Sequence, residues 1–209
     1  MKNFGMRDVV PYFYKMPLPL TTNATVVKEY TQALHTEVES LLLPKLQSLQ
    51  THNEYAAILQ MFYGYFSPLE GAIEQFITAD EMPDMAERRK ALVILQDLQA
   101  LGCSVRGLPV CTELPIINNT TSAFGALYVL EGSTLGGKMI ARMLIKNTAL
   151  SLPENAIGFF SGYREKTGDR WKTFLAELNK QEDAETVAHS ANDTFFALKR
   201  WMQQTLYND

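Results

Sequence analysis

Three glycines stand inside a stretch that otherwise has the pattern of a helix. The stretch runs from Leu127 to Ile140 and contains Gly132, Gly136 and Gly137. Each glycine inside a helix costs about 1 kcal/mol relative to alanine, so the three together cost roughly 2–3 kcal/mol. Two arrangements explain this cost, because both need bare backbone: close packing of another helix, or contact with a flat ligand that a Cβ atom would hold away. This segment alone leaves both explanations open.

A histidine marks a second helical segment upstream. Apolar residues at spacings of three and four predict one face of a helix there: Val27, Tyr30, Leu34, Val38 and Leu41. His35 lies at the margin of that face, where a histidine is ordinarily a hydrogen-bonded boundary residue. The chain has two other histidines, His52 and His189, and both lie in polar stretches. A metal site with several histidine ligands is therefore hard to build.

Composition excludes several classes of protein. The 209 residues, 46% of them apolar, suit a single domain over 1–209, with a leader segment at 1–21 and a core at 22–206. The net charge is −4 and no run of basic residues is present, which argues against nucleic acid as a partner. No segment approaches the ~20 apolar residues of a membrane span. Cys103 and Cys111 match no redox or zinc motif, so we expect a cytoplasmic protein with free thiols.

Periodicity predicts an all-α fold. Strand-like alternation is weak throughout the chain, whereas apolar residues recur with the helical period in several long segments. The expected helices cover 24–43, where Pro44 interrupts the pattern, 54–78, 85–101, 122–150 with Thr120 and Thr121 as caps, a segment that includes Trp171 to Leu178, and 184–206.

Several motifs, taken in order, resemble those of heme oxygenases, the enzymes that open heme to biliverdin and release carbon monoxide and ferrous iron. The resemblance spans about residues 22–202. It rests on residues 28–39 with their Leu-His-Thr-Glu core, on Tyr63-Gly64-Tyr65 followed by Pro68-Leu69-Glu70, on residues 127–137, and on Phe159, Phe160, Trp171, Phe195 and Trp201. It implies a helical bundle that binds heme and uses O2. No nucleotide-binding fingerprint is present, so electrons are expected from a separate reductase, ferredoxin or flavodoxin.

The resemblance also assigns roles around the heme. His35 is expected to be the metal ligand, and Gly132, Ser133, Gly136 and Gly137 are expected to be the catalytic residues on the helix across the opposite face of the porphyrin. Glu39, four residues after His35, is either the acceptor that orients the imidazole or a solvated helix charge.

Polar groups complete the expected site. Lys28 matches a lysine of the family that contacts the heme propionates, and Lys172 is a weaker candidate for the same contact. Animal members carry an arginine one turn after the position of Lys172, where this chain has Ala176. Ser133 replaces the aspartate of animal enzymes; its hydroxyl either holds water or bonds back to the helix. Whether Glu131 faces the heme is left open by the sequence.

Three alternatives compete with this interpretation. A heme-binding or heme-trafficking protein without turnover would need the same histidine and glycines. A di-iron relative would need Glu-x-x-His pairs, whereas Glu185 and His189 have the wrong offset. A helical interaction module would need another helix packed on the glycines.

Overall fold

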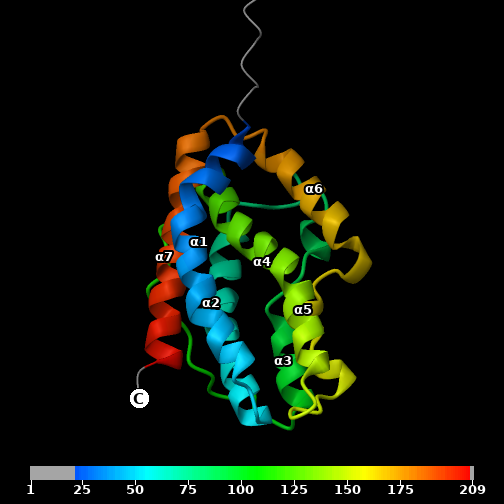
Figure 1. Ribbon diagram of the computed structural model, residues 1–209. Helices are drawn as coiled ribbons and strands as arrows, with labels where there is room; N and C mark the ends of the chain where they lie inside the picture. The colour runs from blue at the N-terminus through cyan, green and yellow to red at the C-terminus, as the bar shows by residue number, and fades with distance from the viewer. Residues whose placement is uncertain (1–21, 208–209) are drawn as a thin grey trace, which may run out of the picture.

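The computed structural model describes residues 22–207, and within them it contains helices and no strand, which confirms the all-α prediction (Figure 1). The α-helices are α1 (Asn23–Gln47), α2 (His52–Ile73), α3 (Leu92–Ala100), α4 (Thr120–Lys146), α5 (Gly158–Ser161), α6 (Thr167–Leu178) and α7 (Ala184–Leu206). Short 3-10 helices, η1 to η3, cover Met85–Glu87, Glu154–Ala156 and Arg164–Lys166. The leader expected at 1–21 lies outside the described residues. None of the helices within 22–207 is long and apolar enough to cross a membrane.

Helix α7 is the element on which the two long helices of the candidate site rest. It packs extensively against both α1 and α4, whereas α1 and α4 themselves hardly touch. Figure 1 shows α1 and α7 running side by side, with α6 on the other side of the molecule. The face of α7 that fills the core includes Val187, Ala191, Leu198 and Met202, at helical spacing. Since α7 supports α1 and α4 separately, a cavity remains between them.

Helix α1 continues through Pro44 and ends at Gln47, so the prediction that the helix stops before Pro44 is wrong. Proline at this position removes the N–H that would bond to the carbonyl of Ser40, and its ring crowds that carbonyl. Ser40 is exposed, so water can satisfy that carbonyl. The predicted buried face is also shifted, because Thr31 is buried and Tyr30 is 48% exposed. The Thr31 hydroxyl donates to the Val27 carbonyl at 2.8 Å, which makes its burial inexpensive.

A single helix was predicted over 85–101, and this prediction is wrong, because the segment forms two separate helical pieces. The 3-10 helix η1 ends at Glu87. The next residue, Arg88, has an extended backbone with φ −70° and ψ 149°, and α3 begins only at Leu92. The Arg88 side chain turns inward and is buried. Leu92 is exposed, and the buried residues of α3 are Ile94, Asp97 and Leu98.

Helix α4, which carries the three glycines, starts two residues before the predicted 122 and ends four residues before the predicted 150. Its cap is Asn119, whose side chain accepts the N–H of Ser122 at 2.8 Å, rather than Thr120 or Thr121. Asparagine has a stronger preference for this position than threonine, and the Ser122 hydroxyl donates back to the Asn119 carbonyl.

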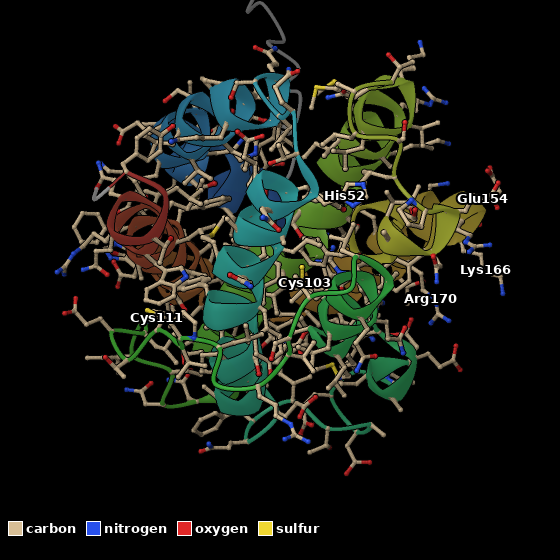
Figure 2. The ribbon with its side chains drawn as sticks, turned by 90° about the horizontal axis from the view of Figure 1, so that it is seen from below. His52, Cys103, Cys111, Glu154, Lys166 and Arg170 are labelled. Carbon is tan, nitrogen blue, oxygen red and sulfur yellow. The ribbon has the colours of Figure 1, made fainter. Side chains whose placement is uncertain are left out.

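The motif at 63–70 joins α2 to its neighbours. The Tyr65 hydroxyl donates to the Thr194 carbonyl at 2.7 Å. A Cβ atom at Gly64 would lie 2.5 Å from the carbonyl oxygen of Pro109 and 2.7 Å from the Trp201 ring, so only glycine fits there. Cys103 and Cys111 are both free and lie apart in Figure 2.

Candidate functional site

A cavity of ≈ 520 Å³ lies between α1 and α4. Other hollows of the surface are smaller, such as one of ≈ 250 Å³ beside Cys111 and Trp201. The volume of the cavity between α1 and α4 is within the ~300–1,000 Å³ that is usual for small-molecule sites. The α1 wall consists of Lys28, Thr31, Gln32, His35, Val38, Glu39 and Leu42, and the α4 wall of Tyr128, Val129, Gly132, Ser133, Leu135, Gly136 and Ile140. The rest of the lining is mostly aromatic and consists of Phe62, Phe66, Phe159, Phe160, Trp171, Phe195 and Leu198.

His35 and Glu39 lie together on the α1 wall. The two side chains are about half exposed, and His35 Nε2 lies 3.5 Å from Glu39 Oε1. The imidazole ring also packs beside Phe195 of α7, with ring centroids 5.4 Å apart. The carboxylate can therefore orient the ring through one nitrogen and leave the other nitrogen for a ligand.

Gly132, Gly136 and Gly137 of α4 serve two different purposes. Gly132 and Gly136 line the cavity; a Cβ atom added to Gly136 would meet nothing within 4 Å, and one added to Gly132 would meet only the Trp171 ring at 3.8 Å. Gly137 is outside the lining and faces α5, where a Cβ atom would lie 2.5 Å from the Phe160 carbonyl oxygen. Helix packing thus explains Gly137, whereas Gly132 and Gly136 present bare backbone that suits a flat group in the cavity.

Ser133 lines the cavity and is tied to a residue that the sequence did not single out. Its hydroxyl donates to the Leu130 carbonyl at 2.6 Å and accepts from Arg89 Nη2 at 2.7 Å. Arg89 precedes α3, and its guanidinium also donates to the carbonyls of Leu130 at 3.0 Å and Phe159 at 3.3 Å. Only the folded chain brings it to α4, since it stands 44 residues before Ser133.

Glu131 points away from the cavity into a buried ionic cluster. Arg88 Nη1 donates to Glu131 Oε2 at 2.7 Å, and the Tyr163 hydroxyl donates to Glu131 Oε1 at 2.8 Å. Burial and the nearby Glu131 carboxylate raise the pKa of Tyr163 well above its usual value. Arg88 and Arg170 both pair with Asp84, and Arg170, which Figure 2 labels, also bonds to Glu87.

The two candidate lysines differ in position. Lys28 lines the cavity at the α1 wall, near Tyr128 and Trp171, which also line the adjoining cavity of ≈ 370 Å³. Lys172 is absent from both linings; its side chain is 81% exposed and lies 3.7 Å from Asp169.

Two carboxyl groups, the buried Asp97 and the partly buried Glu70, hold neighbouring segments in place. Asp97 of α3 accepts the N–H groups of Gly158 at 2.9 Å and Phe159 at 2.8 Å, which fixes the start of α5. Burial raises the pKa of Asp97 to about 6. Glu70 of α2 accepts the N–H of Ala91 with both oxygens, at 2.8 and 2.9 Å, and burial raises its pKa to about 7.

The remaining histidines lie elsewhere. His52, labelled in Figure 2, has Nε2 2.7 Å from the Leu150 carbonyl oxygen, and His189 stacks on Tyr30 with ring centroids 5.0 Å apart. Neither lines the cavity of His35. Within residues 22–207, no group of three His, Cys, Asp or Glu side chains is placed to hold a metal ion.

Comparisons with known proteins give a relative and a family model. A heme oxygenase from Xanthomonas campestris pv. campestris (strain 8004) is 32% identical over 93 residues, which are 44% of this chain. The match spans about half of that relative, 53% of its length. The family model described as heme oxygenase matches residues 21–204, which include every element of the cavity wall. On the strength of that match, the chain belongs to the heme oxygenase family.

Proposed function

We propose that this protein is a heme oxygenase, which opens heme oxidatively to biliverdin with release of carbon monoxide and ferrous iron. The reaction would use O2 and electrons from an external donor. The observation that carries the proposal is that His35 of α1 and the bare backbone at Gly132 and Gly136 of α4 line one cavity from two different helices. Family membership agrees with it.

On the α1 side, His35 would hold the heme iron. A neutral imidazole is a common axial ligand of heme, and its second nitrogen needs an acceptor that fixes the tautomer and the ring orientation. Glu39, 3.5 Å from the ring, is that acceptor in our proposal. Among residues 22–207, His35 is the one histidine that lines the cavity, and we assign the iron ligand to it.

On the α4 side, Gly132 and Gly136 would let the porphyrin plane approach the helix backbone. Heme, when bound, would supply both the redox-active iron and the ring carbon to be oxidised. The α4 wall offers the hydroxyls of Ser133 and Tyr128 but no carboxyl group, because Glu131 is turned away toward Arg88. The aromatic lining excludes water from most of the remaining surface.

At the opening, Lys28 would bind a propionate carboxylate of heme. Its ammonium group forms no ion pair with the described residues, so it is available to an anion. A separate reductase, ferredoxin or flavodoxin would deliver the electrons.

An optical titration with hemin, followed by reductant and O2, tests the proposal. We expect a one-to-one complex with a Soret band, then bleaching of that band and the appearance of biliverdin absorbance. His35→Ala should weaken or change the complex, and added imidazole should restore it in part.

His189→Ala is the matched control, because His189 also lies within reach of a glutamate one helical turn away, with Glu185 Oε1 at 3.7 Å, but outside the cavity. It should bind and convert hemin as the unaltered protein does. A stable complex that takes up oxygen without ring opening would instead identify a heme-binding or heme-trafficking protein. The absence of any complex would refute both functions.

A further inference from the structure

The hydroxyl of Ser133 has little hydrogen-bonding capacity left for the cavity that it lines. A serine hydroxyl has one hydrogen to donate and two lone pairs to accept with. The hydrogen is used by the Leu130 carbonyl at 2.6 Å, and one lone pair is used by Arg89 Nη2 at 2.7 Å. A single acceptor position remains, and it is open only to a group that donates a hydrogen.

Arg89 is held firmly in the position from which it bonds to Ser133. Its guanidinium donates to two backbone carbonyls, those of Leu130 and Phe159, and lies 4.4 Å from the centroid of the Phe159 ring. Its backbone N–H donates to the Tyr163 hydroxyl at 2.7 Å. The charged or titratable groups that act on it are Glu70, Glu131 and Tyr163. The guanidinium is therefore fixed by α4 and α5, and it does not itself line the cavity.

We propose that Arg89 is a positioning residue that keeps the Ser133 hydroxyl an acceptor, and never a donor, toward the cavity. Without Arg89, both lone pairs of the hydroxyl are free and only its bond to the Leu130 carbonyl opposes rotation, so the hydroxyl can turn and donate into the cavity. With Arg89 in place, a water molecule beside Ser133 must point a hydrogen at it. The use of this water beside heme rests on the proposed function.

The pH midpoint of the alkaline transition of the ferric hemin complex measures this polarity without turnover. An acceptor next to iron-bound water stabilises water over hydroxide, so Ser133→Ala should lower the midpoint. Arg89→Met removes a charge as well as the contact, so its effect is compared in two backgrounds, with Ser133 intact and with Ser133→Ala. With Ser133 intact, the midpoint shift caused by Arg89→Met should be more negative, by about half a pH unit or more, than the shift in the Ser133→Ala background. One neutral hydrogen bond can produce a difference of this size.

Arg170→Met is the control, because it removes a neighbouring cation that pairs with Asp84 and has no contact with Ser133. Its shift should be the same in both backgrounds. Arg89→Gln, whose shorter side chain keeps a polar end, replaces Arg89→Met if the latter fails to fold. Equal shifts for the Arg89 variant in both backgrounds would overturn the inference alone. A protein that binds no hemin would overturn the proposed function and this inference with it.

Discussion

Arg88 Nη1 lies 2.7 Å from Glu131 Oε2, and the two side chains are only 1% and 3% exposed. The pair joins the end of η1 to the middle of α4, on the side of α4 that faces away from the cavity. It therefore accounts for the break after η1, which the sequence did not predict, and for the orientation of Glu131, which the sequence left open. It also ties the glycine-bearing part of α4 to the segment after η1, in addition to the packing of α4 on α7.

Removal of one member of this pair should destabilise the protein strongly. Arg88→Met leaves the Glu131 carboxylate buried with only the Tyr163 hydroxyl as a partner, and an uncompensated buried charge costs about 3–5 kcal/mol. Urea unfolding measures the loss. Lys180→Met, which breaks the exposed pair of Lys180 with Glu177, should cost less than about 1 kcal/mol. Similar losses for the two variants would contradict the role given to the buried pair.

Alanine at Gly136 and alanine at Gly137 should change the free energy of unfolding in opposite directions. Gly137→Ala places a Cβ atom 2.5 Å from the Phe160 carbonyl oxygen, so α5 must shift, at a cost of about 1–3 kcal/mol. Gly136→Ala meets open space and gains helix propensity, so it should be neutral or stabilising by up to about 1 kcal/mol. Thermal unfolding of the protein without heme tests both substitutions.

A larger side chain at Gly136 separates packing from ligand binding. Gly136→Leu should leave the fold intact, because the position is open, but it should fill the cavity and impair the binding of hemin or its turnover. Unchanged hemin binding and turnover in a folded Gly136→Leu protein would remove this glycine from the proposed site.

The pKa of Glu70 makes stability depend on pH. Burial raises this pKa from 4.5 to about 7, so between these values the folded protein holds a proton that the unfolded chain has released. The free energy of unfolding therefore falls as pH rises from about 4.5 to 7, with a slope of at most about 1.4 kcal/mol per pH unit from one group. Asp97, whose pKa burial raises to about 6, acts in the same direction from pH 3.8 upward.

Glu70→Gln tests that contribution, because its carbonyl oxygen can still accept the N–H of Ala91. Urea unfolding at several pH values should show a flatter pH dependence in the variant. Glu37→Gln is a control, since Glu37 is exposed, pairs with Lys199 at the surface and has no contact with Glu70. A pH dependence that Glu70→Gln leaves unchanged would contradict the assignment.

The helices were predictable where the signal is local. The bounds 184–206 of α7 agree with the structure because a strong helical period follows a capping residue, Asp183, whose side chain accepts the N–H of Thr186. The break after η1 was not predictable, since its cause is the ion pair of Arg88 with a residue 43 positions away. The extension of α1 past Pro44 likewise depends on the exposure of Ser40, which periodicity does not report.

The residues of the candidate site were likewise predictable only in part. Six residues named from the sequence line one cavity: Lys28, His35, Glu39, Gly132, Ser133 and Gly136. Gly137 and Lys172 were named with them and lie outside it, because a pattern along a helix does not say which neighbour covers each face. Arg89 was missed since its contact with Ser133 exists only in the folded chain.

Lys28 and Lys172 should differ in their effect on hemin binding. Lys28 lines the cavity, whereas Lys172 is exposed beside Asp169, so Lys28→Ala should weaken the binding of hemin several-fold and Lys172→Ala should change it little. Hemin dimethyl ester, which lacks both propionate charges, supplies the control ligand. The Lys28→Ala effect should disappear with the ester if the lysine binds a carboxylate. An equal loss with both ligands would show that Lys28 supports the cavity wall through its aliphatic stem instead.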